Sequence, residues 1–337
     1  MLAADELYQP TLFWREASAN MVKEIAEEGV ENFRRLKGPL GYFVPTYGSP
    51  GNGFSEQQVD ELSSLIKERY PGALKPILAL DSYLNGEAEA LANYRVFMAG
   101  DQTDKAPNLQ AFSESSFGSP KEQFEFEGRA YSRSSLNYLL GLVLLKRHLD
   151  GELPTKVLEI GGGFGSLGEI LAKSEIKDLR YIDVDIPPTG FVAEQYLRAA
   201  LGQSAVATYA STADSAVIDI DSLPTATTLC AWQIERLQGE VDLFVNFISF
   251  QEMEPSVVRN YLSHVERLKA KWVLLRNLRE GKQKWREGSF GVMEPILGDD
   301  YAEMLPNYDL IDRNVLPFGY RTVDNFHSEL LLFRRNA

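Results

Sequence analysis

The sequence contains a single cysteine, Cys230, among 337 residues. One thiol cannot form an internal disulfide, and without a cluster of histidines and cysteines it cannot build the usual structural zinc site. Basic residues are also scarce, because 34 Lys and Arg stand against 48 Asp and Glu, for a formal charge of −14. Nucleic acids and anionic membranes are bound through Lys and Arg, so we expect neither as a partner.

Long hydrophobic runs are missing as well. A membrane-spanning helix needs about 20 apolar residues, and no segment approaches that length. The N-terminal stretch MLAADELYQP is acidic, unlike the basic and then apolar pattern of a signal peptide. The sequence therefore predicts a soluble cytoplasmic protein, and it is compatible with a homo-oligomer.

From residue 151 onward, short apolar runs alternate with helix-like segments. Continuous apolar runs predict strands covered on both faces, and intervening helices imply a parallel sheet. Two final runs are joined by a linker without a helix, so the last strand should return antiparallel. The predicted α/β sheet has seven strands, at 156–160, 179–184, 227–232, 241–247, 271–277, 308–316 and 328–334.

Residues 1–130 show helical periodicity instead, over 13–36, 56–70 and 87–98. A loop rich in Gly and Pro, at 45–54, interrupts it. We predict a mainly helical N-terminal cap and substrate region over 1–130, and a helix over 132–149 that leads into the sheet domain of residues 131–337.

The stretch VLEIGGGFGSLG, residues 157–168, follows the first predicted strand. Gly163, Gly165 and Gly168 satisfy G-x-G-x-x-G, and Asp185 follows at the end of the second strand. This is the dinucleotide fingerprint, in which a helix N-terminus receives pyrophosphate and the acid binds a ribose. Glycines after a strand can also serve only close packing between helix and sheet.

Two features argue against a dinucleotide. Glu159 at the end of the first strand would oppose a pyrophosphate, but it would suit a ligand with an ammonium group. S-adenosylmethionine carries such a group, together with a ribose that an acid can bind. In addition, about 150 residues precede the turn, whereas a dinucleotide-binding fold usually starts with it.

Residues 156–334 resemble the class I S-adenosylmethionine-dependent methyltransferases, whose E-x-G-x-G-x-G pattern falls on Glu159, Gly161, Gly163 and Gly165. More narrowly, LEIGGGFGSLG, VNFISFQEM and NFHSELLLFRR resemble the sugar O-methyltransferases of bacterial natural-product and polysaccharide pathways. The resemblance implies a Rossmann-like mixed sheet and S-adenosyl-L-methionine as cofactor. It also implies methyl transfer to a hydroxyl of a sugar or a glycosylated natural product.

Several residues then become candidates for cofactor contact. Asp185 or Asp183, on the same strand face, would bind the ribose, and we favour Asp185 because it ends the strand. Trp232 would stack on the adenine or belong to the core, and Ser134 would contact the methionine carboxylate or cap a helix. The predicted cofactor set is Glu159, Gly161, Gly162, Gly163, Gly165, Asp185, Trp232, Asn246 and Ser134.

Methyl transfer to a hydroxyl is an in-line displacement that requires removal of a proton, by a general base or with help from a metal. His327, at the start of the last strand, is a candidate base because imidazole titrates near neutral pH. Glu252 is the competing candidate, with an exposed helix-cap carboxylate as its ordinary interpretation. The spacing of the acids does not require a metal, and we expect none.

Aromatic residues beside the Gly and Pro loop, Tyr42, Phe43, Tyr47 and Phe54, would form a sugar platform or, as we favour, a small core. Two alternatives to a methyltransferase remain open. One is an NAD-dependent oxidoreductase that uses the same glycine turn. The other is a non-catalytic protein that retains the fold for binding.

Overall fold

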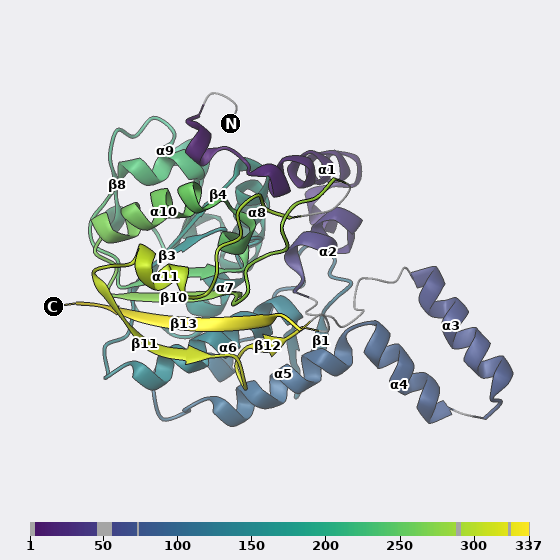
Figure 1. Cartoon of the computed structure of the whole chain (residues 1–337). Coiled ribbons are helices and arrows are strands. Elements are labelled where there is room, and N and C mark those ends of the chain that lie inside the picture. Colours follow the sequence, from purple (N-terminus) through teal and green to yellow (C-terminus); the bar gives the residue numbers. More distant parts are fainter. Residues whose placement is uncertain (1–3, 46–55, 73, 288–290, 323–324, 337) are drawn as a thin grey trace.

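The computed structural model describes residues 4–45, 56–72, 74–287, 291–322 and 325–336. A mixed sheet lies at its centre, in the order β11-β13-β10-β9-β3-β4-β7-β5, with β12 beside β13 (Figure 1). Its strands are β3 Lys156–Ile160, β4 Arg180–Asp185, β5 Val206–Ala207, β7 Ala226–Cys230, β9 Leu243–Phe247, β10 Trp272–Leu278, β11 Tyr308–Asn314, β12 Tyr320–Arg321 and β13 His327–Arg335.

All seven predicted strands are present, and the α/β class is confirmed. The first five are parallel, and β13 runs antiparallel between β10 and β11, as the short linker predicted. The predicted strand count was wrong, because the sheet has nine strands among the described residues. The two additional strands, β5 and β12, are two residues each, which is too short for a recognisable apolar run.

Helices cover both faces of the sheet because successive strand residues point to opposite sides. Val157 of β3 joins the core beneath α6, α7 and α8, whereas Leu158 joins the core beneath α10 and α11. These helices are α6 Arg133–His148, α7 Ser166–Lys173, α8 Pro187–Leu201, α10 Pro255–Arg267 and α11 Asp300–Met304. Shorter elements are η4 Leu109–Ala111, η5 Gln203–Ala205, α9 Tyr209–Thr212, β6 Ile218–Asp219, η6 Ile220–Ser222, η7 Ala231–Arg236, β8 Leu237–Gln238 and η8 Ser249–Glu252.

The N-terminal part is mainly helical, as predicted. The helix expected over 13–36 is broken at Gly29, whose φ of 86° ends α1 and starts a 3-10 turn. The elements are η1 Glu6–Tyr8, α1 Leu12–Glu28, η2 Val30–Arg35, α2 Lys37–Phe43, α3 Glu56–Arg69, α4 Leu74–Leu84, α5 Glu87–Gly100, β1 Phe124–Phe126 and β2 Arg129–Tyr131. The predicted division between residues 130 and 131 falls within β2 and stays a prediction.

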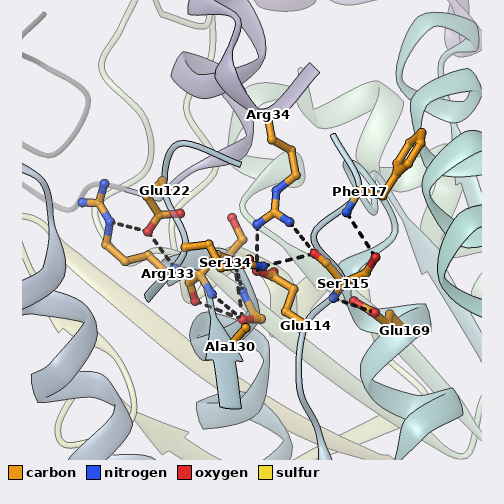
Figure 2. Close-up of polar contacts among 12 residues, drawn as sticks. Arg34, Glu114, Ser115, Phe117, Glu122, Ala130, Arg133, Ser134 and Glu169 are labelled. Carbon is orange, nitrogen blue, oxygen red and sulfur yellow. Dashed lines mark hydrogen bonds and ion pairs between the residues drawn. The ribbon is translucent and has the colours of Figure 1, made fainter. Parts of the chain in front are cut away.

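A buried polar network ties the N-terminal segment to α7, one of the helices that cover the sheet (Figure 2). Arg34 of η2 lies 2.7 Å from the Glu114 carboxylate and donates to the Ser115 carbonyl at 3.0 Å. The Ser115 amide in turn donates to Glu169 of α7 at 2.9 Å. α7 follows the glycine turn directly, so this network holds η2 against the segment that forms the candidate site.

Candidate active site

A cavity of about 500 Å³ lies beyond the carboxyl ends of β3, β4 and β9. Residues 161–164 after β3, Asp185 and Ile186 after β4, and Phe247 to Ser249 after β9 line its floor. Open parallel sheets bind their ligands at this edge, outside the strand ends. Residues 9–11, Trp14 and residues 41–45 of the N-terminal segment form the opposite wall.

The glycine turn after β3 needs residues without side chains. Gly161, Gly163 and Gly165 have φ of 73°, 63° and 87°, the left-handed region that glycine tolerates best. Gly161, Gly162 and Gly163 line the cavity, whereas Gly165 is the N-cap of α7 and faces Leu197. A side chain at Gly168 would collide with the Tyr181 ring, so this last glycine serves close helix–sheet packing.

Two buried carboxylates lie directly behind the turn. Glu159 of β3 and Asp183 of β4 are 0% and 1% exposed. The Tyr181 hydroxyl donates to Glu159 Oε2 at 2.5 Å, and the Gly162 amide donates to Asp183 Oδ1 at 3.2 Å. Their other oxygens, Glu159 Oε1 and Asp183 Oδ2, have no hydrogen-bond partner among the described residues.

Burial dominates the chemistry of this pair. It raises the pKa of Asp183 to about 7. Burial first, and then the charge of Asp183, raise the pKa of Glu159 to about 8, against the hydrogen bonds from Tyr181 and Tyr138. Neither acid lines the cavity. Glu159 lies behind Gly162, which has no side chain to separate the Glu159 carboxylate from a ligand in the cavity.

Of the three acids at the glycine turn, Asp185 lines the cavity. Its Oδ1 accepts from the Ile186 amide at 2.7 Å and its Oδ2 from the Gly163 amide at 3.3 Å. Burial, followed by the charge of Asp183, raises the pKa of Asp185 well above its usual value. Of the two acids considered for a ribose, the structure thus presents Asp185 to the cavity and keeps Asp183 behind the turn.

Glu252 lies at the outer wall of the cavity and is buried. Its Oε1 is 2.5 Å from the Lys282 ammonium, and its Oε2 accepts from the Trp14 indole N–H at 3.0 Å. The Thr11 hydroxyl donates to the Glu252 carbonyl at 2.9 Å. Glu252 therefore anchors the start of α1 over the cavity and is no exposed helix cap.

A second cavity, of about 630 Å³, adjoins the first. Gly41, Tyr42, Leu278, Lys282 and Thr322 line both cavities, so the two spaces meet at this shared wall. Three rings and several polar side chains face the second cavity, namely Phe13, Tyr42, Phe326, Asn20, Glu24, Lys37 and Gln283.

The turn after β9 carries an unusual backbone. Ile248, which lines the cavity, has φ 74° and ψ −39°, a costly conformation for a β-branched residue. Asn246 supports this turn, since its Nδ2 donates to the Ile160 carbonyl at 2.8 Å and its Oδ1 accepts from the Phe250 amide at 3.2 Å. Asn246 is fully buried beneath the cavity, so the structure gives it a positioning role, and its contact with a cofactor stays a prediction.

Three other predicted residues have different surroundings. Ser134 lines the cavity and donates to the Phe43 carbonyl at 2.5 Å, while Ser132 caps α6. Trp232 lies in η7 beside Cys230, in a separate pocket of about 420 Å³. His327 lies outside both cavities, with Nδ1 2.5 Å from Glu280 Oε1. The roles proposed for Trp232 and His327 stay predictions.

The aromatic residues near α2 belong mainly to a core. Phe43 packs on Phe33 and Phe164, with ring centroids 6.2 and 5.9 Å apart, although it also lines the cavity. Tyr47 and Phe54 lie outside the described residues.

Sequence reasoning missed several cavity residues. Tyr138 of α6 stacks on Phe247 at 4.9 Å, and Trp14 and Lys282 hold Glu252. Tyr138 and Trp14 come from helices outside the strand-end segments, so strand position gave no signal for them. Lys282 lies in the segment after β10, and no motif distinguished it in the sequence.

Within the described residues, no three His, Cys, Asp or Glu side chains are grouped closely enough to hold a metal ion. No described helix has the length and apolar character to span a membrane.

No protein-family model and no curated protein matches the chain. Among solved structures, it is similar to magnesium protoporphyrin IX methyltransferase from Synechocystis PCC 6803 with bound S-adenosylmethionine, at 17% identity over 60% of this chain and 81% of that one, with a TM-score of 0.39. A Burkholderia thailandensis 1,6-didemethyltoxoflavin-N1-methyltransferase with bound S-adenosylhomocysteine shows 15% identity, coverages of 58% and 77%, and a TM-score of 0.38. The mitomycin 7-O-methyltransferase MmcR shows 11% identity, coverages of 98% and 74%, and a TM-score of 0.35. These values describe distant likenesses.

Proposed function

We propose that the chain is an S-adenosylmethionine-dependent O-methyltransferase that acts on a hydroxyl of a sugar or a glycosylated natural product. The observation that carries the proposal is the glycine turn with buried carboxylates behind it and Asp185 in front of it. Three acids around one turn provide no counter-charge for a pyrophosphate, whereas a cationic ligand would favour their ionised forms and be attracted to them.

The residues present fit this cofactor. Glu159 Oε1 and Asp183 Oδ2 are buried and lack hydrogen-bond partners among the described residues. A nearby cation would therefore stabilise the ionised form of both carboxylates. The Asp185 carboxylate lines the cavity, where it can accept from ribose hydroxyls. Ile186, Val257 and Tyr261 provide an apolar wall for an adenine. When bound, S-adenosylmethionine supplies the methyl group from its sulfonium.

The second cavity suits the acceptor. Aromatic faces of Phe13 and Tyr42 can pack on the C–H face of a sugar ring, and Asn20, Glu24 and Lys37 can bind its hydroxyls. Glu252 lines the first cavity and is oriented by Trp14 and by Lys282, and Lys282 lines both cavities. We assign to its carboxylate the removal of the acceptor proton, because it lines the cofactor cavity and His327 does not.

Isothermal titration tests the cofactor assignment. We expect micromolar binding of S-adenosylhomocysteine and none of NAD. NAD binding without S-adenosylhomocysteine binding would instead support an oxidoreductase. Methyl transfer from labelled S-adenosylmethionine to a panel of free, nucleotide-linked and glycosidic sugars then tests the acceptor. Transfer only to non-sugar acceptors would reject the sugar assignment while retaining the reaction class.

A further inference from the structure

α3 and α4 form a hairpin that extends away from the body of the molecule, as Figure 1 shows at the right of the view. No described side chain of either helix belongs to the three hydrophobic core clusters. Inside the hairpin, the Ser63 hydroxyl donates to Asp81, and Ile77 and Leu84 are buried. Helices of 14 and 11 residues are marginal in water unless an apolar face is packed.

The hairpin instead exposes large apolar side chains. Leu65 and Tyr70 are 64% and 61% exposed, and Leu78 and Tyr83 are 57% and 50% exposed. Single exposed apolar residues are common, but their concentration on one small projecting element is typical of an interaction site. This observation concerns the arm alone and does not depend on the proposed function.

Charges on α3 indicate what covers it. Glu61 lies one helical turn before Leu65, Arg69 lies one turn after it, and both are exposed. If two copies of α3 cross antiparallel at Leu65, Glu61 of each copy faces Arg69 of the other. A parallel pairing would place like charges opposite each other. The helix is therefore complementary to itself about a two-fold axis.

We propose that the α3–α4 arm is the interface of a homodimer. In this dimer the two α3 helices pack antiparallel, with Leu65 at the two-fold axis and a Glu61–Arg69 ion pair on each side. The formal charge of −14 makes two chains repel at long range, so association needs such a local match. Because the arm is small, we expect a reversible, concentration-dependent dimer.

Sedimentation velocity of the full chain over a range of concentrations tests the association. The wild type should shift from monomer to dimer, and Leu65→Glu should remain monomeric. Val22→Glu is the matched control, because Val22 is 52% exposed but lies on α1. A wild-type chain that stays monomeric at ~200 μM, a weak-binding limit, would overturn the proposal.

A charge exchange tests the antiparallel arrangement. Glu61→Arg or Arg69→Glu alone should weaken the dimer by about tenfold, because each places like charges together twice. The double variant should recover most of the wild-type affinity. Circular dichroism checks that each variant is folded. A folded double variant as weak as the single variants, or single variants as strong as the wild type, would reject this arrangement.

Discussion

Glu159 and Asp183 face each other in register on β3 and β4, and their carboxylates converge behind Gly162. A side chain at Gly162 would begin 2.7 Å from Glu159 Oε2 and 2.6 Å from Asp183 Oδ1. Neither acid pairs with a Lys or Arg in the described part of the chain. Two buried acids without a cation resist ionisation, which is the physical cause of their raised pKa values.

The acid pair predicts a stability that falls as pH rises. The folded pKa values, about 8 for Glu159 and about 7 for Asp183, lie above the unfolded values near 4. The folded state therefore holds protons that the unfolded chain has released, and stability is lost as pH rises from about 4 to about 8. Asp183→Asn should therefore raise the free energy of unfolding more at pH 8 than at pH 5, and the two increases should differ by on the order of 3 kcal/mol.

Urea unfolding of the ligand-free chain at both pH values measures this effect. Asp299→Asn is the control, because the Asp299 side chain is 84% exposed and should show no such pH dependence. An equal change for Asp183→Asn at pH 5 and pH 8 would contradict the interpretation.

Gly162 should not tolerate a side chain, because a Cβ there would meet the carboxylates of Glu159 and Asp183. Gly162→Ala would insert a methyl group between the two carboxylates, so we expect loss of S-adenosylhomocysteine binding by at least about tenfold, together with lower stability. Gly190→Ala in α8 has open space and should be neutral or slightly stabilising. Calorimetry of both variants compares them. Unchanged S-adenosylhomocysteine binding by a folded Gly162→Ala chain would show that the glycine turn is not part of the cofactor site.

The strands could be predicted because burial on both faces leaves continuous apolar runs, and Val157 and Leu158 illustrate this on neighbouring positions. The break at Gly29 was less visible, since the apolar periodicity continues through η2. The hairpin β1–β2 was missed because three-residue strands carry too little pattern. Local sequence thus determines the sheet better than it determines the cap.

The candidate general bases can be separated by two substitutions. Glu252→Gln should lower kcat by about a hundredfold or more, with S-adenosylhomocysteine affinity retained, because a proton acceptor is lost while the contact with Trp14 can remain. His327→Ala should have a smaller effect, since His327 contacts Glu280 outside both cavities. Steady-state kinetics with a sugar acceptor measures both. A larger loss of kcat for His327→Ala than for Glu252→Gln would assign the role of general base to His327.

The site was only partly predictable, because the position of a residue after a strand does not determine where its side chain points. Position after a strand pointed to residues 161–163, Asp185 and Glu252, which line the cavity, while their cofactor and catalytic roles stay predictions. It also indicated Asn246, which turns beneath the floor, and Trp232, which the 3-10 turn η7 directs to another pocket. Lys282 and Trp14 reach Glu252 through tertiary packing that no local motif records.

Arg34 should stabilise the glycine turn from a distance. Its guanidinium pairs with Glu114 at 2.7 Å, and both side chains are buried (Figure 2). The guanidinium also lies 5.1 Å from the centre of the Phe164 ring within the turn. Arg34→Met would leave the Glu114 charge buried without its partner, which costs about 3 kcal/mol. Because Phe164 lies between Gly163 and Gly165, we also expect weaker S-adenosylhomocysteine binding. Arg35→Met, at the exposed neighbouring position, should change neither quantity. Thermal unfolding and calorimetry on the two variants measure both effects, and equal behaviour of the two would show that the network does not support the site.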